Sequence, residues 1–160
     1  EIRQLSPSNL GHYTVYLPAI DDRDLVNVLK QIPQVRWEVF SKHTKIAYTD
    51  GNVFVEPINN EKFNQSMASC EGVFTGGGFE GPAEALHLGK KLLVAPMRFQ
   101  YEQQCNAYAL KQFGLPVIWG SNHNWMPILK DFVANPQEHK FDFPDETAAI
   151  IAHTVNTFAR

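Results

Sequence analysis

Short apolar runs alternate with amphipathic segments along almost the whole chain. Each run is continuous and bounded by turn-forming residues, which is typical of a buried β-strand. These predicted strands span residues 13–17, 35–40, 53–56, 73–75, 92–95 and 116–119. Between them, apolar residues recur three or four positions apart, as on one face of a helix. We expect a helix through residues 25–32, helices over 61–69, 82–88 and 101–113, and two more through 126–133 and 151–158.

This alternation of strands and helices predicts an α/β fold. Its Rossmann-like parallel sheet would be covered by helices on both faces, because continuous apolar strands need burial on both sides. Ligands of such sheets bind beyond the carboxyl ends of the strands. The loops after residues 73–75 and 92–95 lie at that edge, so we place the candidate site there.

Three consecutive glycines, Gly76 to Gly78, join the fourth predicted strand to the next helix. Glycine adopts positive φ at little cost and lets a ligand approach the backbone closely. Pro82 suits the first helical position and Gly89 the helix stop. The free amides and positive dipole of the helix start would then face the turn as a phosphate cradle. A tight strand-to-helix turn is the simpler alternative, but it needs fewer glycines.

Residues 72–107 resemble the donor-binding segment of GT-B glycosyltransferases. The shared features are the glycine turn, Glu84 on the following helix, the GKKLLVAP segment at 89–96, and Glu102-Gln103 shortly before Asn106. The likeness extends to UDP-glycosyltransferases, to the enzyme that makes lipid II by adding GlcNAc, and to a family of uncharacterised prokaryotic transferases. It implies that the chain forms the C-terminal half of a GT-B fold.

The resemblance also implies roles for particular residues. Gly76, Gly77 and Gly78 would bind the pyrophosphate, with Phe79 beside them, and Glu84 would bind the two ribose hydroxyls. The two oxygens of a carboxylate suit a cis-diol. Glu102 and Gln103 would bind hydroxyls of the donor sugar. The alternative for Glu84 is a glutamate that complements the helix dipole. For Glu102 and Gln103 it is a solvated helix start.

Two positions depart from the pattern of the relatives. Many relatives have His where Gly76 stands, so one donor to phosphate is missing. Glu80 replaces a frequent Asn, and a carboxylate beside phosphate costs Coulomb energy.

The remaining donor contacts are predicted at three further positions. Arg98 and Lys42 lie in loops at the ligand edge and are the candidate cations for the pyrophosphate, although either can be an ordinary surface cation. The resemblance places the base against the loop at 57–59, read by backbone groups near Ile58.

Composition and charge argue against some classes of protein and indicate a cellular location. The 160 residues form one domain with room for a core, and a net charge of −3 argues against a nucleic-acid binder. Cys70 and Cys105 have no metal-like spacing and suit reduced thiols in a cytosolic protein. No apolar run is long enough to span a membrane and no signal peptide is visible. We expect a cytoplasmic location, with peripheral association at the inner face of the membrane through a missing half.

The predicted domain organisation follows from the polar, irregular start of the chain. Residues 1–10 are interpreted as a linker or interdomain segment and 11–160 as the nucleotide-sugar-binding domain. An N-terminal acceptor domain would then be absent, and the chain would be a fragment of a longer polypeptide.

Two other motifs carry less weight. Asp22-Arg23-Asp24 spells a D-x-D metal–nucleotide motif of another glycosyltransferase fold, but helix capping is the better account here. The six histidines form no cluster, and no catalytic residue can be identified. We expect no cofactor and no metal.

Together with these patterns, the resemblance implies the donor-binding domain of a hexosyltransferase-type glycosyltransferase. Its substrate would be a nucleoside diphosphate sugar, with uridine as the expected nucleoside. The isolated chain would be inactive. Two alternatives stay open: a natural donor-binding subunit of a split transferase, and a GT-B nucleotide-sugar epimerase or sensor.

Overall fold

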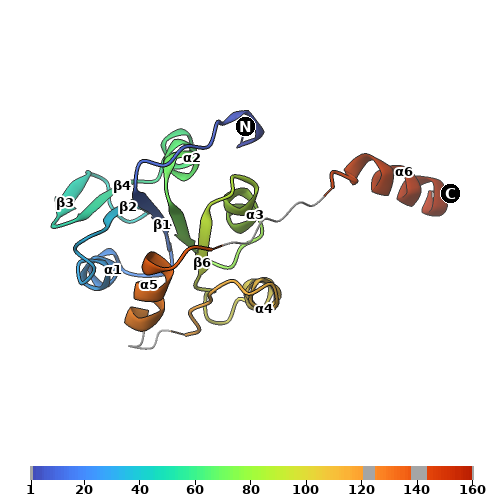
Figure 1. The fold of residues 1–160 in the computed structure, drawn as a ribbon. Coiled ribbons are helices and arrows are strands. Elements are labelled where there is room, and N and C mark those ends of the chain that lie inside the picture. The colour runs from blue at the N-terminus through green and yellow to red at the C-terminus, as the bar shows by residue number, and fades with distance from the viewer. Residues whose placement is uncertain (1, 121–124, 138–143, 160) are drawn as a thin grey trace.

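The computed structural model describes residues 2–120, 125–137 and 144–159, and it is built around one six-stranded sheet (Figure 1). The strand order is β3-β4-β2-β1-β5-β6. All neighbours are parallel except β3 and β4, which are antiparallel. The strands are β1 (His12–Tyr16), β2 (Arg36–Ser41), β3 (Tyr48–Asp50), β4 (Val53–Pro57), β5 (Gly72–Thr75) and β6 (Lys91–Val94).

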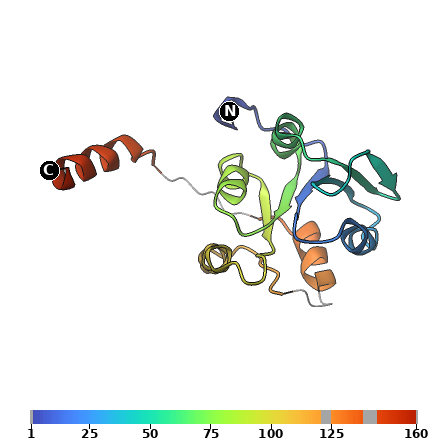
Figure 2. The same cartoon turned by 180° about the vertical axis from the view of Figure 1, so that it is seen from behind.

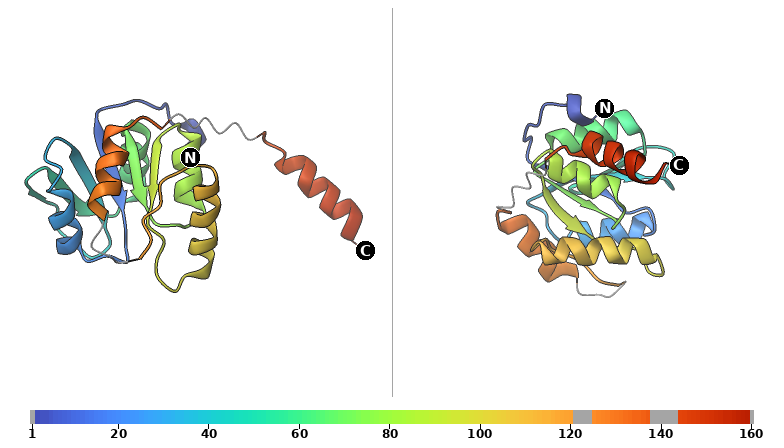
Figure 3. Two further views of the ribbon diagram at one scale, coloured as in Figure 1. Left: turned by 60° about the horizontal axis from the view of Figure 1, so that its bottom comes forward. Right: turned by 90° about the vertical axis from the view of Figure 1, so that its right-hand side faces the viewer.

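Helices cover both faces of this sheet, as Figure 2 shows. On one face α1 and α5 pack over β1, β2, β4 and β5, and on the other α2 and α3 enclose a second core cluster. Figures 1 and 3 show α4 at the β6 end, where Ala107 joins the second cluster. The helices are α1 (Asp22–Leu29), α2 (Asn60–Ser69), α3 (Glu80–His87), α4 (Tyr101–Gln112), α5 (Trp125–Ala134) and α6 (Thr147–Phe158), after a short 3-10 turn η1 (Ile2–Gln4).

This arrangement confirms the predicted α/β fold class. Val15, Val39 and Phe74 in the central strands β1, β2 and β5 are almost fully buried, as expected for strands covered on both faces. At the start of α1, the Asp21 side chain accepts a hydrogen bond from the Arg23 amide, which supports the capping interpretation of this segment.

The predicted strand at 116–119 is wrong. Residues there form only an isolated bridge between Val117 and Val94. The Val94 amide donates to the Pro116 carbonyl and the Ile118 amide donates to the Val94 carbonyl, at 3.3 and 2.8 Å. Pro116 has no amide to extend this ladder, so an apolar run that looks like a strand pairs at a single point.

The edge strand β3 was missed because its residues carry no apolar pattern. All of Tyr48–Asp50 is exposed, and the strand turns back into β4 at Gly51, whose φ is +62°. A polar edge strand is held by its neighbour's backbone rather than by burial of its own side chains.

The first residues of the described chain pack against the domain, whereas the last helix does not. Ile2 is buried in the second cluster, and the amides of Ser8 and Leu10 donate to carbonyls at the end of α2. The linker role of residues 1–10 stays a prediction. In contrast, α6 stands apart from the sheet in Figure 1 and none of its residues is buried. Within the described residues, no helix is long and apolar enough to cross a bilayer.

Candidate functional site

Two loops meet at the carboxyl edge of the sheet, after the paired strands β5 and β6. The first is the glycine loop, defined as residues 76–79, and the second is the loop at 95–100. Gln103 of α4 joins them, because its Oε1 accepts the Gly77 amide at 3.2 Å and the Met97 amide at 3.1 Å. Sequence reasoning predicted Gln103 as a sugar ligand and missed this structural contact. Its Nε2 makes no hydrogen bond within the described ranges and remains a donor.

Gly77 is needed for the close approach of α4. A Cβ built on Gly77 lies 2.5 Å from the Gln103 carbonyl oxygen, which no side chain would tolerate. Asn106 adds a second tie, since its Nδ2 donates to the Gly77 carbonyl at 3.1 Å. None of the three loop glycines has positive φ, so the expected use of left-handed backbone is wrong. Close packing, not turn geometry, explains Gly77.

The start of α3 leaves its backbone amides open to a ligand. The helix begins at Glu80, two residues earlier than predicted, and its N-cap Phe79 makes no side-chain hydrogen bond. The first amides of a helix have no intrahelical partner, and they concentrate positive partial charge. A Cβ on Gly78 would meet nothing within 4 Å, so the loop is open on that side.

Glu84 lies in the second turn of α3, not in the first as predicted, because the helix starts at Glu80. Its side chain is half-buried. Four residues along a helix correspond to about 6 Å, so Glu84 stands roughly that far from the helix start. Glu80 lies at the start itself and is exposed.

The loop at 95–100 carries a cation and a strained aromatic residue. Arg98 is exposed, and its guanidinium lies 5.4 Å from the centre of the Phe99 ring. Phe99 has φ +64° and is 91% exposed. Positive φ is uncommon for a bulky residue, and residues with such backbone strain cluster at functional sites. Sequence reasoning gave no signal for Phe99.

Glu102 lies in the first turn of α4 and is exposed. Its Oε1 accepts a hydrogen bond from Asn106 Nδ2 at 3.2 Å. This contact uses only one of the two carboxylate oxygens. Because the side chain is exposed, the other oxygen can accept a hydrogen bond from a polar ligand.

Lys42 and Ile58 form a second group, two and three strand positions away from β5. They follow β2 and β4, and the Ile58 amide donates to the Ser41 carbonyl at 2.8 Å. Asp22 fixes this region, since its carboxylate accepts bonds from Ser41 Oγ at 2.7 Å and Thr44 Oγ1 at 2.8 Å. Three inter-strand spacings separate β4 from β5, about 14 Å.

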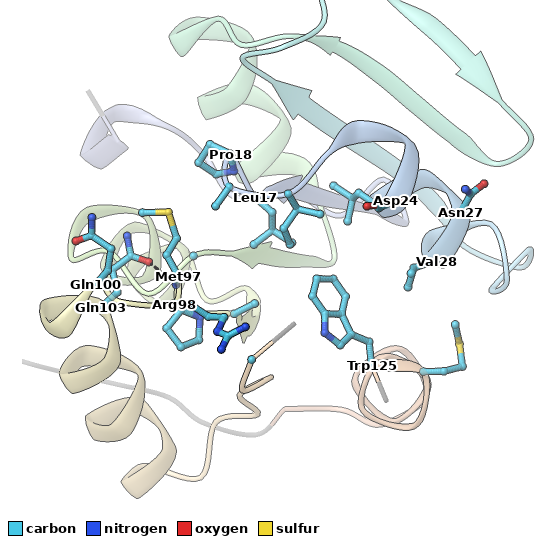
Figure 4. A pocket seen from close by; sticks show the side chains of 18 of the residues that line it. Leu17, Pro18, Asp24, Asn27, Val28, Met97, Arg98, Gln100, Gln103 and Trp125 are labelled. Carbon is cyan, nitrogen blue, oxygen red and sulfur yellow. Dashed lines mark hydrogen bonds between the residues drawn. The ribbon is translucent and has the colours of Figure 1, made fainter. Parts of the chain in front are cut away.

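A cavity of about 860 Å³ opens at the same edge, on the α1 and α5 side of the sheet (Figure 4). Gly76, Arg98 and Gln103 contribute to its lining, so it is continuous with the loops described above. Its other walls come from the loop after β1, from α1 and from the start of α5. Sequence reasoning missed this cavity, because many of its lining residues, such as Leu25 and Val28, have the pattern of ordinary core residues.

The sequence model of glycosyl transferase family 1 matches residues 1–136. The chain belongs to this family. No curated protein matches the chain by sequence.

Solved structures of glycosyltransferases share the fold of this glycosyl transferase domain. The glycotransferase of kitacinnamycin has a TM-score of 0.60 at 16% identity, and the match covers 79% of this chain and 36% of that chain. SnogD from Streptomyces nogalater has a TM-score of 0.52 at 14% identity, with 94% and 45% covered. ALG13 has a TM-score of 0.53 at 15% identity, with 84% and 92% covered. The chain thus spans less than half the length of the first two.

In this family member the predicted site residues other than Glu84 fall into two groups. The loops after β5 and β6 bring together one group: Gly76, Gly77, Gly78, Phe79, Arg98, Glu102 and Gln103. Lys42 and Ile58 lie near each other but apart from that group, and Glu84 lies on α3 beyond the glycine loop. Their roles as ligands stay predictions.

Proposed function

We propose that the chain binds a nucleoside diphosphate sugar and serves as the donor-binding domain of a glycosyltransferase. The observation that carries the proposal is the uncapped start of α3 beside the open glycine loop, in a chain of a glycosyl transferase family. Amides and a positive helix dipole at one point favour an anionic diphosphate.

The arrangement of the two residue groups supports an extended ligand. A diphosphate at α3 would place its ribose toward Glu84 and its base toward Ile58, about 14 Å along the edge from β5. On the other side, Glu102 and the amide nitrogen of Gln103 would meet the sugar. The resemblance of residues 72–107 to UDP-glycosyltransferases supports uridine as the nucleoside.

In this proposal the leaving diphosphate needs no divalent cation. Backbone amides at α3 and the guanidinium of Arg98 would stabilise its charge, as preorganised donors do for other anionic leaving groups. Among the residues that the structure describes, no group of three or more His, Cys, Asp or Glu side chains is placed to hold a metal. We propose a cytoplasmic location for such a domain.

Calorimetric titration of the chain with UDP tests the proposal. We expect weak binding that is the same with and without a chelator. Absence of UDP binding would contradict the donor role, and binding that disappears in chelator would contradict the metal-free cradle.

A second candidate is a natural donor-binding subunit that works with a separate acceptor-binding chain. The match to ALG13 favours it, because this chain covers 92% of that solved chain and the fold therefore exists at this size. The open reading frame of the parent gene separates the two candidates, since only the first predicts a preceding acceptor domain in the same polypeptide.

A further inference from the structure

The residue Arg98 lies in a tight turn that runs from Met97 to Gln100. The Gln100 amide donates to the Met97 carbonyl at 3.4 Å, which closes the turn. Phe99 is its third residue and has φ +64°, whereas Arg98 does not have positive φ. A type II turn has this pattern, and its third residue is usually glycine because other residues are strained there. The chain therefore has a bulky aromatic residue at a position that favours glycine.

Burial does not explain why Phe99 occupies this position. Its side chain is 91% exposed, so the ring adds little to the apolar core. Among the residues that the structure describes, no other residue except glycine has positive φ. The strained backbone is thus accepted without a gain from packing. Such an outlier points to a role for the exposed ring itself.

The contact that the ring makes is with its neighbour Arg98. The guanidinium carbon lies over the Phe99 ring, 5.4 Å from its centre. A cation within about 6 Å of a ring face is attracted by the negative charge of the π system. In the described part of the chain, the guanidinium makes no hydrogen bond and no ion pair, so the Phe99 ring is the group that restricts it.

The turn is fixed beside the glycine loop. The amides of Met97 and Gly77 donate to the same oxygen, Oε1 of Gln103, and Arg98 follows Met97 directly. Arg98 and Gly76 also line the same cavity, and Figure 4 shows Arg98 on the side of the cavity where Gln103 lies. A guanidinium held at this place is close to the loop that leads to the uncapped start of α3.

We propose that Phe99 is a positioning residue for the diphosphate: its ring holds the Arg98 guanidinium ready to bind phosphate oxygens of a nucleoside diphosphate. The inference rests on the proposed function, since the diphosphate is the ligand. Phe99 acts through Arg98 and does not touch the nucleotide. A cation that is already restricted loses less freedom when the ligand binds, so the restriction increases affinity. For an exposed cation over a ring, the expected gain in affinity is about two- to five-fold.

Calorimetric titration of the 160-residue chain with UDP tests this coupling. Phe99→Leu keeps a bulky apolar side chain but removes the aromatic face, and it should weaken UDP binding about two- to five-fold. Phe99→Tyr keeps the face and should bind UDP like wild type. Arg98→Ala should weaken UDP binding at least as much as Phe99→Leu. Adding Phe99→Leu to Arg98→Ala should cause no further loss, because the two residues act as one unit.

Phe99→Gly separates positioning from support of the fold. Glycine adopts positive φ without strain, so the urea midpoint should stay or rise while UDP affinity falls as in Phe99→Leu. A lower midpoint together with lower affinity would show that the ring supports the fold, and would overturn the proposal. Tyr108→Leu is the matched control, since it removes an exposed ring from α4 and should change neither the midpoint nor UDP affinity.

The titrations also separate this proposal from the donor role. If wild type binds UDP and Phe99→Leu binds it equally well, the positioning role is overturned and the donor role stands. A full loss from Phe99→Leu in the Arg98→Ala background also overturns the positioning role, because Phe99 would then contact the nucleotide directly. If UDP does not bind to wild type at all, the positioning role fails together with the proposed function.

Discussion

At the scale of single residues, Gly77 has room for a hydrogen atom and nothing larger. A methyl group there would lie 2.5 Å from the Gln103 carbonyl oxygen, so Gly77→Ala must push α4 away from the glycine loop. Overpacking of this kind costs about 1–3 kcal/mol. We expect urea unfolding to show that loss for Gly77→Ala.

The neighbouring glycine provides the control. A Cβ on Gly78 meets nothing within 4 Å and its φ is not positive, so Gly78→Ala should change stability by less than about 0.5 kcal/mol. Equal losses for the two variants would show that the close packing of Gly77 does not decide its identity.

Glu84 is the residue on which the ribose prediction depends. Glu84→Ala should weaken UDP binding by about 1–3 kcal/mol, since it removes charge-assisted hydrogen bonds to the ribose. Glu80→Ala changes an exposed glutamate one turn earlier on the same helix and should leave UDP affinity unchanged or slightly stronger. Calorimetry with UDP and with its 2′,3′-dideoxy analogue measures both effects. If Glu84→Ala preserves the wild-type preference for the ribose hydroxyls, the assignment is wrong.

His12 makes stability sensitive to acid. Its side chain is 2% exposed, and its Nε2 lies 3.0 Å from Ser66 Oγ and 3.2 Å from Glu38 Oε2. Burial lowers the pKa of His12 from its ordinary value of 6.5, although the Glu38 carboxylate opposes the change. The unfolded chain therefore takes up a proton first as pH falls below 6.5, and the free energy of unfolding falls with it.

Urea unfolding at about pH 7.5 and pH 5.5 measures this dependence. His12→Gln should show a smaller loss of stability between the two pH values than wild type. His153→Gln changes an exposed histidine on α6 and should keep the wild-type loss. The same loss in His12→Gln as in wild type would contradict the assignment.

At the scale of elements, α4 and the two site loops form one unit. Gln103 accepts amides from both loops, so Gln103→Ala leaves two backbone donors without their partner. Each lost hydrogen bond costs about 1 kcal/mol, and the glycine loop also loses its fixed position. We expect Gln103→Ala to lower both the unfolding free energy and UDP affinity.

Gln104 is the matched control for this prediction, because it is exposed and adjacent on α4. Gln104→Ala should change neither the unfolding free energy nor UDP affinity. A Gln103→Ala variant that keeps full stability and loses only affinity for a donor sugar would show that Gln103 acts as a ligand and not as a support.

At the scale of the whole molecule, we expect no sugar transfer by the chain alone. The chain spans 36% and 45% of the length of two glycosyltransferases with its fold. Transfer needs an acceptor held in line with the anomeric carbon, and such positioning supplies several kcal/mol of the barrier. Transfer is measured with the chain alone and with its parent polypeptide or partner chain. Multiple turnovers by the chain alone would refute this expectation.

The sequence by itself determined the α/β class, because strand and helix periods differ and each stretch must bury its apolar side locally. It located the glycine loop and the helix that follows, and it placed five of the sheet's strands within about a residue or two of their observed ends. It failed at 116–119, where Pro116 restricts pairing to one bridge, and at β3, which is exposed throughout.

Only the tertiary structure decided which site residues meet. Gln103 binds the backbone of Gly77 across the gap between two loops, and Gly77 is required by that contact. The cavity is formed by residues far apart in the chain, such as Val28 and Trp125, which have the pattern of ordinary core residues. The physical reason is that periodicity records which side of an element is apolar. The distances between side chains of different elements depend on how those elements pack.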